Sequence, residues 1–295
     1  LSVINSTMIK TIFFGSSEYS VIILQQLLRL PDFDIQAVFT KPDKAVGRHQ
    51  TITPNPVTIF ATKNHLPLFQ PEEFDDQLRT TLRQFQPDLG LVVAYGPPYF
   101  TQDMIDIPTH KIINIHPSPL PKYRGATPGP WQIINGETTS AVTFFQIDAL
   151  PDHGPIITQI PLKITPTETA ATFYQKAFTL AATNLEPVLK SYLTHPNSLT
   201  PQDHTQKSYF PKFTKDTAKI DWNWSPVKID RFIRALQPWP IAWTYVINQQ
   251  HQTLKMKLFS ATIADNQLIP QLVQIEGKKP TPWSEISKYY TIKKS

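Results

Sequence analysis

Apolar and polar residues follow two different periods in the first two-thirds of the chain. Short apolar runs typical of buried strands alternate with stretches of helical spacing. The expected strands are residues 10–14, 35–40, 88–95, 111–116, 141–148 and 155–164, and the expected helices are 18–30 and 167–192. Strands separated by helices predict a mostly parallel α/β sheet, whose active site lies beyond the carboxyl ends of the strands.

The last third of the chain has a different pattern. Residues 194–212 are polar, contain proline and lack periodicity, which predicts a linker. A helix is expected at 226–236, and strand-like runs follow at 242–247, 253–260 and 271–274. We therefore expect a Rossmann-like domain over residues 8–193 and a small β-rich, OB-like barrel over residues 213–295. Residues 1–7, before Met8, are expected to be a leader or an extension.

Charge separates the same two parts of this 295-residue chain, whose net charge is +5. Residues 1–204 hold 14 Lys and Arg against 17 Asp and Glu, a net of −3, whereas residues 205–295 hold 14 against 6, a net of +8. The basic second part favours an anionic partner such as a nucleic acid, although a merely soluble basic surface would look the same. Cysteine is absent, which excludes disulfides and thiolate chemistry and suits a reducing compartment. No apolar run reaches the ~18 residues of a membrane span.

Residues that suit chemistry gather around two strand ends. Residues 114–125 read Asn-Ile-His-Pro-Ser-Pro-Leu-Pro-Lys-Tyr-Arg-Gly, and Asp152 follows the next strand. Asn114 and His116 are two residues apart, so they point to the same side of their strand. If the two strand ends are neighbours, the three side chains can converge.

Such a trio suits acyl transfer to an amine. An amide such as Asn114 can bind a developing oxyanion, and an imidazole such as His116 can move a proton near neutral pH. A carboxylate such as Asp152 can orient the imidazole. The attacking amine needs no covalent nucleophile of the protein. A hydrogen-bonded strand end without a catalytic role would show the same Asn-x-His pattern.

These residues resemble the folate-dependent formyltransferases, in which the matching Asn, His and Asp are the catalytic trio. The resemblance assigns that role to Asn114, His116 and Asp152. Segments 39–57, 93–96, 209–243 and 276–280 are similar to the methionyl-tRNA formyltransferase branch, and the resemblance runs from about residue 8 to 290. It implies a cytoplasmic, monomeric enzyme that transfers the formyl group of 10-formyltetrahydrofolate to initiator methionyl-tRNA for translation initiation. No tightly bound cofactor and no metal are expected.

The resemblance also implies two sets of ligand contacts. The residues expected to contact the folate donor are Val93, Ala94, Tyr95, Gly96, Ser118, Leu120, Pro121 and Asp148. Those expected to contact tRNA are Lys41, Lys44 and Arg48 in an inserted loop, and Lys212, Lys215, Lys278 and Lys279 in the second domain.

Three segments depart from the family pattern. Gly15-Ser16-Ser17 stands where the family has Gly-Thr-Pro, and His-Gln-Thr follows Arg48 where glycine and lysines are usual. The second domain is short between residues 260 and 271, where a glycine-containing hairpin is usual. None of the three departures falls on the catalytic trio.

Two other functions stay open on the sequence. A sugar-nucleotide formyltransferase would keep the trio but needs neither the inserted loop nor the basic domain. A non-catalytic RNA-binding protein on an old enzyme scaffold is disfavoured by the intact trio. Trp222, Trp239 and Trp243 alternate with apolar residues, so core packing is expected rather than base stacking. His153 is expected to be an exposed turn residue rather than an acid–base group.

Overall fold

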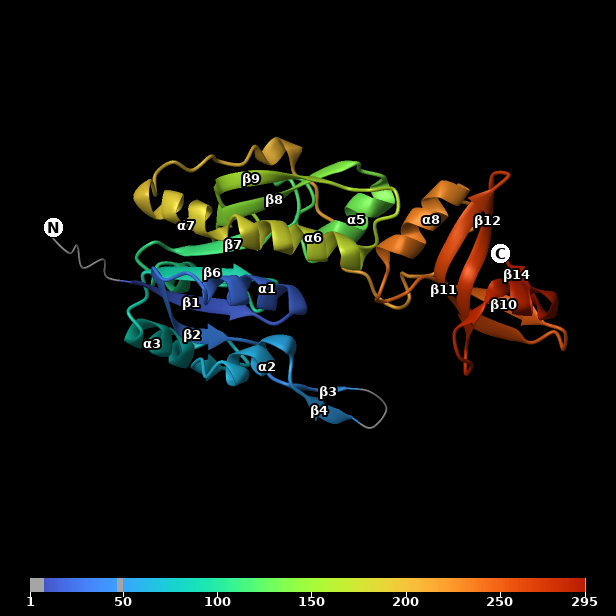
Figure 1. The fold of residues 1–295 in the computed structure, drawn as a ribbon, viewed down its shortest axis with the longest axis horizontal. Coiled ribbons are helices and arrows are strands. Elements are labelled where there is room, and N and C mark those ends of the chain that lie inside the picture. The colour runs from blue at the N-terminus through green and yellow to red at the C-terminus, as the bar shows by residue number, and fades with distance from the viewer. Residues whose placement is uncertain (1–7, 47–49, 295) are drawn as a thin grey trace. The chain divides into compact units, whose positions relative to one another are not determined.

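The computed structural model describes residues 8–46 and 50–294 (Figure 1). Its helices are α1 Glu18–Leu27, α2 Pro56–Lys63, α3 Asp76–Gln84, α4 Gln102–Ile105, α5 Pro128–Asn135, α6 Ala170–Thr183, α7 Leu185–Thr194, α8 Pro226–Ala235 and α9 Trp283–Ile286. Its strands are β1 Ile9–Gly15, β2 Phe33–Phe39, β3 Lys44–Val46, β4 Thr51–Thr53, β5 Leu68–Phe69, β6 Leu89–Val93, β7 Ile112–His116, β8 Thr139–Gln146, β9 Ile156–Lys163, β10 Trp243–Asn248, β11 Thr253–Ala264, β12 Gln267–Ile275, β13 Thr281–Pro282 and β14 Tyr290–Lys293. Short 3-10 turns lie at His204–Gln206 and Ser287–Tyr289.

A seven-stranded sheet forms the first part of the fold, in the order β5-β2-β1-β6-β7-β8-β9. The strands from β5 to β7 pair in parallel, and β8 runs antiparallel to β7. In β1, Ile12, Phe13 and Phe14 are all fully buried, so both sides of the strand are covered. A strand covered on both sides reads as a continuous apolar run, which is why the pattern predicted it. The expected mostly parallel, Rossmann-like sheet is confirmed.

An aromatic cluster fills one side of this sheet. Phe14 stacks on Phe39 with ring centroids 4.7 Å apart, and Tyr95 meets Phe14 edge-on at 5.8 Å. Phe74 stacks on Tyr95, and Phe100 packs against Phe14. The cluster packs the end of β1 against the residues that follow β6, at the carboxyl edge of the sheet.

The single helix expected over residues 167–192 is two helices, α6 and α7. The break lies at Asn184, whose ψ of 4° leaves the helical path, and Pro187 stands in the first turn of α7. Proline has no N–H to donate, and its ring would collide with the carbonyl four residues before it in a continuous helix. The first turn of a helix tolerates proline because an N–H there has no partner within the helix, so the chain starts a new helix here.

The C-terminal residues form a five-stranded sheet in the order β13-β12-β11-β10-β14, with antiparallel pairing throughout. Helix α8 packs against β11 and β12. Asp265 and Asn266 join β11 to β12 with φ of 49° and 55°. Both values match the left-handed pair of a two-residue hairpin turn, which Asp and Asn tolerate better than other non-glycine residues. The expected small β-rich domain is confirmed, and its hairpin closes without glycine.

The described chain divides into two compact units. The first contains the described residues up to 124 with residues 141–161 and 175–208, and the second contains residues 125–140, 162–174 and those from 209 onward. The boundaries expected at residues 193 and 212 stay a prediction. Over the described residues, no helix combines the length and the apolar character that a membrane crossing requires.

Candidate active site

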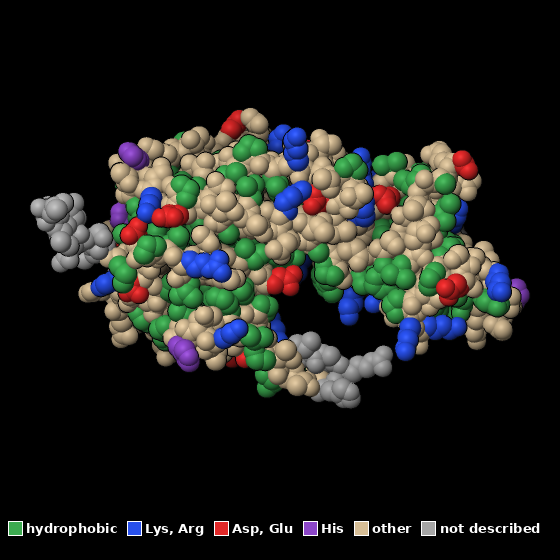
Figure 2. Space-filling model, viewed as in Figure 1, with side chains coloured by type: hydrophobic (Ala, Val, Ile, Leu, Met, Phe, Trp, Pro, Cys, Tyr) green, Lys and Arg blue, Asp and Glu red, His purple; other side chains and the backbone are tan. Residues whose placement is uncertain are grey.

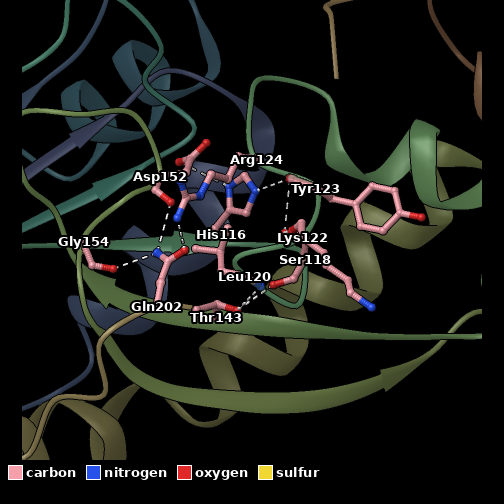
Figure 3. Close-up of polar contacts among 10 residues, drawn as sticks. All are labelled: His116, Ser118, Leu120, Lys122, Tyr123, Arg124, Thr143, Asp152, Gly154 and Gln202. Atoms are coloured by element: carbon pink, nitrogen blue, oxygen red, sulfur yellow. Dashed lines mark hydrogen bonds and ion pairs between the residues drawn. The ribbon is translucent and has the colours of Figure 1, made fainter. Parts of the chain in front are cut away.

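His116, the last residue of β7, is held between a main-chain carbonyl and a carboxylate (Figure 3). The residue is 6% exposed, and its Nε2 lies 2.9 Å from the Tyr123 carbonyl oxygen. A carbonyl oxygen can only accept, so Nε2 carries a proton and donates it. Nδ1 lies 3.7 Å from Oδ1 of Asp152. That separation is an ion-pair distance rather than a hydrogen bond. The imidazole is therefore fixed on one side, with Nδ1 turned toward the carboxylate.

The proline-rich turn after β7 supplies that fixing carbonyl. Ser118 Oγ donates to the Lys122 carbonyl at 2.8 Å, and the amide N–H of Tyr123 donates to Ser208 Oγ at 2.9 Å. Thr143 Oγ donates to the Ser118 carbonyl at 2.6 Å, which ties the turn to β8. Tyr123 itself has a φ of 60°, in the left-handed region. Hydrogen bonds at both ends thus hold the turn in the shape that aims the Tyr123 carbonyl at His116.

Asp152 lies in the turn between β8 and β9. Gln146 at the end of β8 lies beside Ile113, near the start of β7, because the two strands are antiparallel. The loop after β8 must therefore fold back to carry Asp152 to His116. Asp148 begins this loop by accepting from the N–H of Leu150 at 3.0 Å and from Nδ1 of His153 at 2.5 Å. The two strand ends were expected to be neighbours, and they are not, because β8 runs antiparallel to β7. The loop after β8 brings Asp152 to His116 instead.

Glycine is required at the end of this turn. A Cβ added to Gly154 would overlap the carbonyl oxygen of Gln146, which is main chain and cannot swing away. Asp152, two residues earlier, has a φ of 52°, a left-handed conformation that costs a non-glycine residue energy. The turn is therefore tightly determined on both sides of the carboxylate.

Asn114 lies one pleat before His116, on the same side of β7. Its side chain is half-buried, and its amide makes no hydrogen bond to any residue that the structure describes. A half-buried amide that is not used within the protein is open to an external acceptor. Among the described residues, no group of His, Asp and Glu side chains is arranged to hold a metal ion.

The expected folate residues fall into two groups. Val93 is the last residue of β6, and Ala94, Tyr95 and Gly96 follow it. This segment lies next to the Gly15-Ser16-Ser17 turn, where Ser16 Oγ donates to the Ala94 carbonyl at 3.2 Å. Ser118, Leu120 and Pro121 lie in the turn that orients His116, where Gln159 Nε2 donates to the Leu120 carbonyl at 2.8 Å. Asp148 opens the Asp152 turn.

Tyr95 is unusual among them because its side chain is buried and its hydroxyl has no hydrogen-bond partner in the described part of the chain. Burial raises the pKa of this phenol to about 12. The ammonium of Lys41 lies over the Tyr95 ring, 4.0 Å from its centroid, and donates to the Pro97 carbonyl. Burial and the nearby charge of Lys44 lower the pKa of Lys41. The structure therefore places Lys41 against the β6 end.

The remaining residues expected to contact tRNA are distributed over the two compact units. Lys44 is exposed at the start of the β3–β4 hairpin, and Arg48 lies outside the described residues. In the second unit the expected lysines are exposed, namely Lys212, Lys215, Lys278 and Lys279.

Two features of the site differ from what the sequence predicts. Gln202, in the segment expected to be a linker, is buried and donates to the carbonyls of Asp152 and Gly154. His153, expected as an isolated exposed turn residue, is half-buried, bonds Asp148 and stacks on His204 with ring centroids 4.0 Å apart. Neither contact has a signal in the sequence, because a lone glutamine or histidine in a polar stretch resembles any solvated residue.

The tryptophans divide between burial and exposure. Trp243 is 8% exposed and donates to the Lys215 carbonyl at 2.6 Å, which confirms the expected packing. Trp222 is half-buried and donates to Thr244 Oγ at 2.8 Å. Trp239 is 53% exposed, so core packing was the wrong expectation for it. Prolines on both sides of Trp239 set the path of the main chain there, and alternation with apolar residues therefore did not predict which way its side chain points.

Comparison with known proteins gives a consistent relationship over most of the chain. Residues 9–188 match the formyl transferase family, and residues 212–271 match the formyl transferase C-terminal domain. The chain is 37% identical over 256 residues to the methionyl-tRNA formyltransferase of Chloroflexus aggregans, covering 86% of this chain and 81% of that protein. It is 34% identical over 276 residues to the methionyl-tRNA formyltransferase of Staphylococcus epidermidis, covering 93% and 83%.

The fold has counterparts among solved structures. A sugar 3N-formyl transferase crystallised with dTDP and 5-N-formyl-THF superposes with a TM-score of 0.65 at 20% identity, over 92% of this chain and 99% of that chain. At that identity the likeness concerns the fold alone. The domain matches and the relatives confirm the resemblance drawn from the Asn-x-His and Asp-x-Gly residues. The chain belongs to the formyl transferase family.

Proposed function

We propose that this chain transfers the formyl group of 10-formyltetrahydrofolate to the amino group of methionine on initiator tRNA. The observation that carries the proposal is the pairing of His116 Nδ1 with Asp152 Oδ1, 3.7 Å apart, two residues along β7 from Asn114, whose amide bonds none of the described residues. The relatives named methionyl-tRNA formyltransferase support the choice of acceptor. We place the reaction in the cytoplasm, where initiator tRNA is used.

The proposed reaction needs one oxyanion donor and one proton carrier. The amine nitrogen attacks the formyl carbon, and the carbonyl oxygen becomes an oxyanion that the Asn114 amide can bind. His116 takes the amine proton at Nδ1, because Nε2 is already committed to the Tyr123 carbonyl. Asp152 then stabilises the imidazolium. The bond from the formyl carbon to N10 of the folate breaks, and N10 receives a proton.

We infer that the donor binds at the end of β6, close to the trio. Ala94 and Gly96 are exposed and have positive φ values, so main-chain groups are presented at this edge. Val92 pairs with Asn114 across β6 and β7, which puts this strand end next to the catalytic strand. The orphan hydroxyl of Tyr95 supports a ligand there, since a buried polar group without a partner is costly. A pterin is flat and rich in donors and acceptors, which suits exposed strand ends.

We further infer that the C-terminal sheet holds the RNA on one of its two sides. Trp243 pairs with Lys257, and Tyr245 pairs with both Lys255 and Lys293, so these five side chains share one side of the sheet. The alternate residues of β10, β11 and β12 are fully buried on the other side, namely Val246, Met256, Leu258 and Val273. The lysine-bearing side is therefore the one available to a partner.

Lysines and aromatic rings are interleaved on that side. The Lys255 ammonium lies 3.6 Å from the Trp243 ring centroid, and Lys219 lies 5.5 Å from that of Tyr245. Basic residues that follow a phosphate backbone, interleaved with aromatic rings, are typical of RNA-binding sheets. Figure 2 shows Lys and Arg side chains along the lower edge of this unit in that view. Phosphate contacts position an RNA without reading its sequence, so a preference for the initiator must come from other residues.

The proposal is tested by formyl transfer from radiolabelled 10-formyltetrahydrofolate to methionyl-tRNA, with a sugar-nucleotide amine as the competing acceptor. We expect label on methionyl-tRNA only. His116→Ala, Asn114→Ala and Asp152→Ala should each lower kcat by ~10²–10³ while binding tRNA normally. His195→Ala, an exposed histidine after α7, is the matched control and should keep full activity. Label on the sugar amine instead would assign the chain to the other acceptor class.

A further inference from the structure

Gln202 uses every hydrogen-bonding group of its side-chain amide inside the protein. It is 6% exposed and lies outside any helix or strand. Its Nε2 donates to the Asp152 carbonyl at 3.1 Å and to the Gly154 carbonyl at 2.7 Å. Its Oε1 accepts from Nη2 of Arg124 at 2.6 Å. Figure 3 shows the three bonds radiating from the one amide.

The orientation of this amide is fixed by chemistry. A guanidinium has no acceptor, so the group that faces Arg124 must be the amide oxygen. The two carbonyls have no donor, so the group that faces them must be the NH2. A flipped amide would oppose like groups at all three contacts. The side-chain amide of Gln202 can therefore bind in one orientation only. Its oxygen accepts from Arg124, and its NH2 group donates both hydrogen bonds to the turn that carries Asp152.

Gln202 binds Asp152 and Gly154, the two residues on either side of His153. Asp152 is in a left-handed conformation that costs energy, and bonds to the carbonyls of Asp152 and Gly154 hold the chain there. The Asp152 carboxylate lies 3.7 Å from His116 Nδ1, so a small shift of the turn changes that approach directly.

Arg124 is anchored in turn by His204. Its Nη2 lies 2.8 Å from His204 Nδ1, and its main-chain N–H donates to the Ser208 carbonyl at 3.0 Å. Because the guanidinium only donates, Nδ1 of His204 must accept, and His204 is neutral in this arrangement. Desolvation lowers the pKa of His204, as do its electrostatic interactions with His153, Arg124 and Lys207, and together these outweigh the opposite effect of Asp148.

We propose that Gln202 is a positioning residue for the catalytic carboxylate, held in orientation by Arg124 and, through it, by His204. Gln202 does not touch either substrate; it sets where Asp152 stands relative to His116. The inference rests on the proposed function, because it gives Asp152 the role stated above. Segment 202–208 is then part of the active site through its contacts with the two catalytic turns.

The test is a double-mutant cycle between Gln202 and Asp152 in the full chain. Gln202→Met keeps the volume of the side chain and removes the three bonds. We expect its kcat for methionyl-tRNA to fall by ~10–10²-fold, since a displacement near 1 Å is worth up to ~10²-fold. The KM for both substrates should stay within about twofold. In the Asp152→Ala background, Gln202→Met should cause no further loss, because its effect passes through the absent carboxylate.

Gln132→Met is the matched control. Gln132 is another buried glutamine, on α5, whose Oε1 accepts from Ser140 Oγ at 2.5 Å and whose Nε2 donates to the Pro128 carbonyl. It should lose stability without losing kcat. Gln202→Glu is the second variant should Gln202→Met not fold. It keeps the acceptor for Arg124 and sets carboxylate oxygen against two carbonyls, so the same loss of kcat is expected.

Each outcome of the cycle has one meaning. A folded Gln202→Met or Gln202→Glu protein with normal kcat overturns the positioning role, as does a loss that multiplies with that of Asp152→Ala. If wild-type protein formylates methionyl-tRNA and the Asp152→Ala variant is equally active, the proposed role of the carboxylate is overturned. Wild-type protein that does not formylate methionyl-tRNA overturns the proposed function and the inference with it.

Discussion

Replacing Gly154 by alanine should perturb the candidate active site without altering a residue proposed to be catalytic. The added Cβ would overlap the Gln146 carbonyl oxygen. Ordinary van der Waals contact begins at 3.4 Å, so the two main-chain segments must separate by roughly 1 Å or more. Asp152 is two residues away in the same turn and has to move with it. We expect Gly154→Ala to displace the carboxylate from His116 and so to lower kcat.

The size of the effect follows from the displacement. A shift of about 1 Å in a catalytic group is worth ~10²-fold in rate, which corresponds to about 2.7 kcal/mol of transition-state stabilisation. Overpacking should also lower the free energy of unfolding by ~1–3 kcal/mol. Steady-state formylation gives kcat and the KM for methionyl-tRNA, and urea unfolding gives the stability. The KM should change little, because no residue proposed to contact tRNA moves.

The matched control is Gly136→Ala. Gly136 ends α5 with a φ of 75°, so alanine there is also strained, but its Cβ would meet the flexible end of Arg231 rather than main chain. It should lose ~1–2 kcal/mol of stability and keep its kcat. A folded Gly154→Ala protein with kcat within twofold of wild type would refute the reasoning, since the carboxylate could then move without consequence.

Three further predictions concern side chains outside the catalytic trio. His204 should titrate below its ordinary pKa of about 6.5, so the unfolded chain takes up a proton that the folded chain refuses, and stability falls as pH drops below that value. Between about pH 7 and about pH 5.5, the melting temperature of the His204→Asn variant should therefore fall less than that of wild type. Tyr95→Phe removes a buried orphan hydroxyl and should raise the free energy of unfolding by about 1 kcal/mol, measured in urea, while raising the KM for the folate donor. Lys255→Gln with Lys257→Gln should make the plot of log Kd for tRNA against log salt shallower by about 1.4–1.8, whereas Lys63→Gln on α2 should leave the slope unchanged.

The strand pattern and the positions of Asn114 and His116 at a strand end were predictable from the sequence for one physical reason. Strands covered on both sides must be apolar throughout, so residues 10–14 and 88–95 could be recognised without knowing their neighbours. Residues two apart on a strand share a side, which grouped Asn114 with His116. The approach of Asp152 required a further assumption, because antiparallel β8 ends beside Ile113 and only the loop carries the carboxylate back.

What escaped the sequence depends on contacts between distant segments. Gln202 meets the Asp152 turn and Arg124 across 50 and 78 residues of chain, and nothing in its own neighbourhood distinguishes it from a solvated glutamine. The lysine-bearing side of the C-terminal sheet emerges only when β10, β11 and β14 are paired in register. The division of residues 167–192 had a local signal in Pro187, which the helical spacing around it outweighed.

The bond from His116 Nε2 to the Tyr123 carbonyl has a consequence for how this enzyme can vary. The acceptor belongs to the peptide backbone, so no substitution at position 123 deletes it. A different side chain there would leave the carbonyl that fixes His116 in place. A change in the length of this turn would have a different effect. One residue inserted or removed between His116 and Tyr123 would present another carbonyl, at another angle, to the ring. Over evolutionary time this turn should therefore tolerate changes of side chain and resist changes in its number of residues.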